Sequence, residues 1–206
     1  MVGVRIVYMN SLSFYWLIVP NLLLAWIPLL ASLYVCRSLR DGRRPGIAAA
    51  ALAVVWLAFY PNASYIVTDL KHLSYISTER TLYYDLSVNM LAAVLGWLLG
   101  ALSLYGIHAE VKRRAGAVAG GLFAGAVTVL GAIGVYLGRV LRWNSWDLLR
   151  KPGRIITDVL HIAADPQALL FIAAFSAMTG TLYFMLYQLA DKSGLYFAKQ
   201  VHYNDR

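Results

Sequence analysis

The sequence of 206 residues is 60% apolar and only 14% charged, whereas soluble domains are usually about 45–50% apolar and about 25% charged. Its apolar residues form long uninterrupted runs, which indicate an integral membrane protein rather than a large soluble core. The net charge of +8 suits anionic membrane lipids as partners and, in a membrane protein, does not argue for nucleic acid. A single cysteine, Cys36, excludes an internal disulfide and a cysteine-rich metal site.

In chain order, five runs contain no charged residue, and each is longer than the roughly 20 residues that a helix needs to cross the hydrocarbon of a bilayer. They are residues 14–36, 47–68, 86–107, 115–138 and 166–190. Between the last two runs, residues 154–165 place apolar side chains on one helical face and polar ones on the other, which predicts an amphipathic helix in the membrane interface. We therefore expect an all-α integral membrane protein of five transmembrane helices plus one interfacial amphipathic helix, in a single membrane domain of residues 1–206.

The fourth run is rich in glycine, and several of its glycines are three or four residues apart. Small residues at this spacing allow helix backbones to approach closely in lipid. We expect this helix to be the centre of the bundle.

The distribution of basic residues predicts the orientation. If the amino terminus lies outside, ten of the 18 lysines and arginines fall on the inner side and eight on the outer side, and five of those eight lie within residues 139–154. Without that linker the bias is clear, and the positive-inside rule then places the amino terminus outside and the carboxyl terminus in the cytoplasm. The linker arginines oppose the rule, which suggests that they serve another purpose.

Five spans bring three polar segments to one face of the membrane: the end of the second run, the start of the third and the end of the fourth. The side chains that can meet there are Asn62, Asp69, His72, Asp85, Asn89, Arg139, Arg142, Asn144 and Asp147.

Three blocks in these segments resemble a known family. They are residues 61–70 (PNASYIVTDL), 84–86 (YDL) and 138–147 (GRVLRWNSWD). They look like the signature blocks of an uncharacterised bacterial integral-membrane family, labelled only as a domain of unknown function. The resemblance implies a bacterial multi-span membrane protein and supplies no activity, so the roles that follow rest on chemistry.

Asp69, His72 and Asp85 are the candidate catalytic residues. Asp69 with His72 offers a general base and its orienting partner, or two ligands for a divalent metal; the alternative is a solvated loop that caps the next element. For Asp85 the alternative is a favourable interaction with the amino end of the third helix. The sequence names neither a metal nor another cofactor.

Arg139 and Arg142 are the candidate anion- or headgroup-binding residues, together with Asn144, Asp147 and Asn62. Two guanidinium groups on one helix face can bind phosphate or carboxylate bidentately. The alternative is an internal ion pair with Asp69, Asp85 or Asp147.

The leading hypothesis is an outward-facing polar site in the bacterial cytoplasmic membrane that binds or processes a phosphate- or carboxylate-bearing lipid or envelope precursor. Catalysis and simple binding both stay open, because the chain contains no motif that names a reaction. The alternatives are a transporter or permease subunit, or a structural or assembly subunit of a membrane complex. Transport would favour ionisable groups near the bilayer midplane, where this chain has none, although an oligomer could form a pore.

Overall fold

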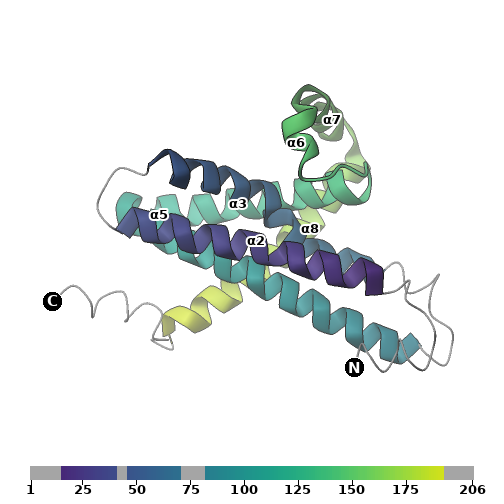
Figure 1. Ribbon diagram of the computed structural model, residues 1–206, viewed down its shortest axis with the longest axis horizontal. Helices are drawn as coiled ribbons and strands as arrows, with labels where there is room; N and C mark the ends of the chain where they lie inside the picture. The colour runs from purple at the N-terminus through teal and green to yellow at the C-terminus, as the bar shows by residue number, and fades with distance from the viewer. Residues whose placement is uncertain (1–14, 41–45, 71–81, 193–206) are drawn as a thin grey trace.

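The computed structural model describes residues 15–40, 46–70 and 82–192, and this part of the chain is helical with no strand (Figure 1). The elements are α2 (Tyr15–Arg40), α3 (Ile47–Tyr65), the 3₁₀ helix η1 (Ile66–Asp69), α5 (Leu82–Arg139), α6 (Asp147–Arg150), α7 (Pro152–Ala164) and α8 (Pro166–Lys192). In the described residues four helical segments, namely α2, α3 with η1, α5 and α8, are long and apolar enough to cross a membrane. The all-α class is confirmed, and the four apolar helices indicate a multi-pass membrane protein.

The structure differs from the predicted helix count at the third and fourth runs, which belong to one helical element, the 58-residue α5. In the sequence these two runs are separated by the charged segment 108–114. Its alanine, glutamate, lysine and arginine side chains are good helix formers, so helical structure continues through it. The break falls a few residues later, at Gly116, whose φ of 90° and ψ of 168° are not helical. A positive φ of this kind favours glycine.

The two halves of α5, residues 82–115 and 117–139, lie side by side. Trp56 of α3 donates a hydrogen bond to Ser103 Oγ at 3.1 Å and stacks on Phe123 with 6.1 Å between ring centroids, although a straight helix would separate residues 103 and 123 by about 30 Å. A Cβ added to Gly120 would meet the His108 ring at 3.0 Å. The chain therefore turns back at Gly116, and Figure 1 shows both halves running beside α2 and α3.

Glycines on both halves of α5 allow the carboxyl end of α3 to approach closely. An added Cβ would lie 2.8 Å from the Ala63 carbonyl oxygen at Gly96, and 2.3 Å from Pro61 Cγ at Gly134. Such distances leave no room for a methyl group. The fourth run was expected to form the central helix of the bundle. Near Gly134 it does pack closely on α3, whereas nothing lies within 4 Å of a Cβ added to Gly121, so that part is not closely packed.

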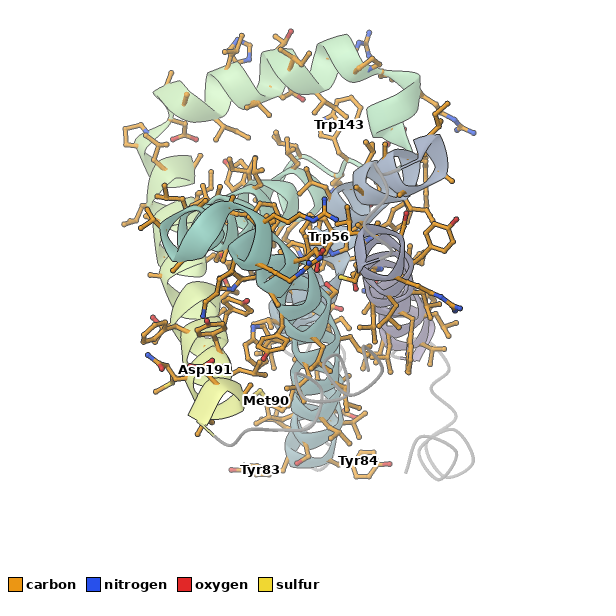
Figure 2. The ribbon with its side chains drawn as sticks, turned by 90° about the vertical axis from the view of Figure 1, so that its left-hand side faces the viewer. Trp56, Tyr83, Tyr84, Met90, Trp143 and Asp191 are labelled. Carbon is orange, nitrogen blue, oxygen red and sulfur yellow. The ribbon has the colours of Figure 1, made fainter. Side chains whose placement is uncertain are left out.

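Helix α7 crosses the bundle near the end at which α5 finishes (Figure 2). It begins two residues earlier than predicted, after the short α6 that the sequence did not predict. Its predicted apolar face is divided: Ile155 is buried, as is Ile162 one further residue round the helix, whereas Ile156 and Leu160 are 61% and 67% exposed. One apolar edge of α7 thus packs on the bundle, and a second edge faces outward.

The glycine packing predicts a contrast between two alanine substitutions in α5. Gly134→Ala should destabilise the protein by about 1–3 kcal/mol, because the rigid Pro61 ring cannot move away from the new methyl group. Gly121→Ala, in open space, should leave stability unchanged or raise it by up to about 1 kcal/mol through helix propensity. Thermal melts of the detergent-purified variants measure both, and equal melting temperatures for the two variants would contradict the packing described here.

Candidate functional site

The central polar contact of the bundle is an ion pair between Asp69 of η1 and Arg139, the last residue of α5. Asp69 is 2% exposed, and its second carboxylate oxygen accepts a hydrogen bond from Asn21 Nδ2 of α2 at 3.0 Å. Arg139 donates through Nε to Thr68 Oγ1 at 2.7 Å, and its guanidinium carbon lies 4.0 Å from the centroid of the Tyr65 ring. The Asp69–Arg139 pair therefore joins three elements: η1 to α5 through the ion pair, and η1 to α2 through Asn21.

The 3₁₀ turn explains why Thr68 and Asp69 face Arg139. Three residues per turn places side chains three apart above one another, and Thr68 Oγ1 also donates to the Tyr65 carbonyl at 2.6 Å. Tyr65, one turn earlier, thus lies under the same guanidinium group that Thr68 holds. This geometry matches the alternative stated from the sequence, an internal ion pair between Arg139 and Asp69.

Arg142 does not share these contacts. It is exposed and adopts φ 59°, the left-handed conformation in which the chain leaves α5 and in which glycine is usual. Trp143 N, the next amide, donates back to the Leu137 carbonyl at 3.0 Å and closes the helix end. Arg139 and Arg142 were expected to bind one anion together. In the structure Arg139 contacts Asp69, whereas Arg142 lies at the end of α5 without that contact.

Arg142 lines a cavity of about 590 Å³, a volume within the range of small-molecule sites. Its polar lining residues include Asn21, Asn62, Arg142, Asn144 and Ser145, and its apolar lining residues include Leu24, Leu57, Phe59, Leu130, Ile133 and Val159. Trp143 and Trp146 lie on the same rim. Asp69 and Arg139 are not among the lining residues.

Hydrogen bonds hold the polar lining residues in place. Asn62 Nδ2 donates to Ser145 Oγ at 3.1 Å, which joins α3 to the segment after α5. Asp147 accepts from the Asn144 amide at 2.9 Å. Trp143 Nε1 donates to Asp158 at 2.7 Å, and Figure 2 shows Trp143 beneath α7. These hydrogen bonds join α3, the loop after α5, and α7 beside the cavity.

Other predicted site residues lie elsewhere. His72 falls outside the described residues. Asp85 and Asn89 are buried in the first half of α5, at 0% and 1% exposure, and neither is among the residues that line the cavity. Neither polar atom of the Asn89 side chain has a hydrogen-bond partner among the described residues. Among all the residues that the structure describes, no group of three or more His, Cys, Asp or Glu residues is arranged to hold a metal ion.

Comparison with known families matches residues 20–182 to the family described as "Protein of unknown function (DUF1361)". The chain belongs to this family. Neither a curated protein nor a solved structure matches it. The matched residues include α3, α5, most of α2 and α8, and every residue that lines the cavity. The family description assigns no activity.

Sequence reasoning did not select Asn21, Tyr65 or Thr68, although each of them contacts the ion pair or lines the cavity. Asn21 offered one signal, since it is a lone amide near the start of an apolar run, directly after Pro20. Tyr65 and Thr68 lie in the family-like block 61–70, but their spacing relative to Arg139, more than 70 residues away in the chain, has no periodicity that a sequence pattern can detect.

The ion pair predicts a large stability effect. Arg139→Ala leaves the Asp69 carboxylate buried without its cation, which should destabilise the fold by about 3–5 kcal/mol. A second change, Asp69→Asn, removes that uncompensated charge and should restore much of the loss. Denaturant or thermal unfolding of the single and double variants tests this, and a double variant no more stable than Arg139→Ala would show that the pair is not coupled.

Proposed function

We propose that the protein binds a phosphate- or carboxylate-bearing amphiphile, a lipid or envelope precursor, at the outer face of the bacterial cytoplasmic membrane. The observation that carries the proposal is the composition of the cavity: polar residues, among them Arg142, Asn144 and Ser145, line it together with apolar residues such as Leu57, Phe59 and Ile133. A charged headgroup and an apolar chain each find matching side chains there.

Arg142 is the anion-binding residue in this proposal. A left-handed backbone costs a non-glycine residue about 1–2 kcal/mol, and strain of this kind is concentrated at functional sites. The left-handed conformation ends α5, where glycine is usual, so an exposed arginine there is not accounted for by backbone preference, and the proposal assigns its role to the side chain. Asn62 and Asn144 orient the headgroup beside it, and Asp147 fixes Asn144.

In this proposal Arg139 does not bind the anion and Asp69 is not a general base. Both residues position the end of α5 instead. Asp69 Oδ1 accepts from Arg139 and Oδ2 accepts from Asn21, and a general base must reach the proton that it removes. Since Asp69 is not among the residues that line the cavity, the geometry favours binding over turnover. A catalytic role for His72 or Asp85 stays a prediction.

The proposed topology has five membrane crossings, with the amino terminus outside. A straight 58-residue helix would be about 87 Å long, nearly three times the hydrocarbon thickness, and the break at Gly116 divides α5 into two segments that each suffice for one crossing. Helix α7, with exposed Ile156 and Leu160, then lies in the outer interface over the cavity.

Cysteine labelling in intact cells tests this topology. On a Cys36→Ala background, Ser145→Cys should react with an impermeant maleimide from outside, and Ser38→Cys and Ala115→Cys only after permeabilisation. Labelling of Ala115→Cys from the same side as Ser145→Cys would contradict two crossings by α5.

Photo-crosslinking tests the site. The probe is a long-chain alkyl phosphate with a diazirine in its chain, and the same chain with a neutral alcohol headgroup is the control ligand. The phosphate should label residues 130–159 of the purified protein far more than the alcohol does. Arg142→Gln should reduce that labelling about tenfold or more, the effect expected when a hydrogen bond to a charged group is lost.

The matched control is Arg154→Gln, which removes one positive charge from an exposed site on α7 outside the cavity lining; its labelling should equal that of the parent. Arg142→Gly should lose labelling like Arg142→Gln but melt at the same or a higher temperature, because glycine relieves the left-handed backbone. Undiminished labelling of both Arg142 variants would remove this residue from the site.

A further inference from the structure

A second cavity of about 590 Å³ lies between the later half of α5 and α8, at the opposite end of the bundle from Arg139. Its walls are mostly small side chains, among them Ala117, Gly121, Gly125, Ala177 and Gly180. Nothing lies within 4 Å of a Cβ added to Gly121 or Gly125. The missing side chains on α5 therefore leave a groove that α8 does not fill.

The groove has the depth of one membrane leaflet. On α5 it extends from Ala117 to Val129, which at 1.5 Å per residue is about 18 Å. Half of a hydrocarbon core of about 30 Å is about 15 Å. A transmembrane helix from a second copy would continue across both leaflets, whereas a lipid chain entering from one side would end where this groove ends.

The mouth of the groove is polar and positively charged. Lys112 is the only charged residue among the described residues that line it. Its Nζ donates to Tyr187 OH at 2.6 Å and lies 5.4 Å from the centroid of that ring. His108 Nδ1 is 2.7 Å from Tyr183 OH, and the His108 ring stacks on Tyr187 with 4.9 Å between centroids. These contacts fix one cation and two hydroxyl groups at the end of an apolar groove.

Two further features make this end attractive to an anion. The later half of α5 starts after the break at Gly116, so the positive end of its helix dipole lies at the mouth, beside Ala117. Arg113 and Arg114 follow Lys112 and pair with Glu110, and Arg114 also donates to the Leu39 carbonyl at the end of α2. Asp191 near the end of α8 also acts electrostatically on Lys112. Three cations, Lys112, Arg113 and Arg114, therefore stand against two carboxylates, Glu110 and Asp191, and this end keeps a net positive charge.

We propose that this groove binds an anionic phospholipid, with one acyl chain between α5 and α8 and the phosphate held by Lys112 and Tyr187. Basic pockets between membrane helices bind anionic lipid headgroups in this manner. The site is separate from the cavity at Arg142 and does not rest on the function proposed for it.

The test uses the full-length protein in detergent with a phosphatidylglycerol that carries a diazirine in one acyl chain, beside phosphatidylcholine with the same chain. Phosphatidylglycerol should label residues 117–129 and 176–187 several-fold more than phosphatidylcholine. Gly125→Leu fills the groove and should reduce the labelling about tenfold or more. Ala126→Leu adds the same side chain at the neighbouring exposed position, outside the lining, and should leave the labelling unchanged.

Lys112→Gln tests the headgroup contact without changing the packing of the groove. It should lower the phosphatidylglycerol labelling to the phosphatidylcholine level, and Lys112→Arg should retain most of it, because charge is what the phosphate requires. Equal labelling by the two lipids in the parent protein overturns the proposal, as does full labelling of Gly125→Leu. A Gly125→Leu variant that turns a dimer into a monomer on size exclusion with light scattering, while keeping its lipid labelling, would instead assign the groove to a second copy.

Discussion

The close packing of the end of α3 against both halves of α5 is the constraint on which the rest of the structure depends. Gly96 on one half and Gly134 on the other approach the segment Pro61–Ala63 so closely that neither position has space for a Cβ. This packing brings η1, which follows α3 directly, against the end of α5. The Asp69–Arg139 ion pair can form only because these two helix ends are held together in this way.

The ion pair in turn determines which arginine is available for a ligand. Arg139 is neutralised by Asp69 and held by Thr68 and Tyr65, and a buried pair of this kind tolerates the loss of neither partner. Three residues later the chain leaves the helix in a left-handed turn, which directs Arg142 to the rim of the cavity. One arginine fixes the wall of the cavity, and the other supplies its charge.

The helical class and most helix boundaries could be predicted because uninterrupted apolar runs are a local property of the sequence. The continuity of α5 through residues 108–114 could not be predicted, because a charged segment at a membrane surface is compatible with a loop and with a helix. Glycine spacing predicted that residues 115–138 form a closely packed helix, but which glycines face a neighbour depends on tertiary packing. For the site, the sequence selected both arginines and Asp69 as candidates. It could not say which arginine Asp69 would bind, because their separation from it in the chain is almost the same.

The proposed topology also accounts for the basic linker that opposes the positive-inside bias. Among its positive residues, Arg139 is already paired with Asp69. Asp147 within the linker and Asp158 just after it bond Asn144 and Trp143. These carboxylates, together with Asp69, offset part of the charge of the five basic residues within 139–154. Arg142, exposed at the cavity rim and outside these contacts, keeps its charge for an anion. In the proposed orientation the outer side carries eight positive and six negative residues, whereas the inner side carries ten positive and four negative residues. The inner side is then the more basic of the two and the one that favours anionic lipid.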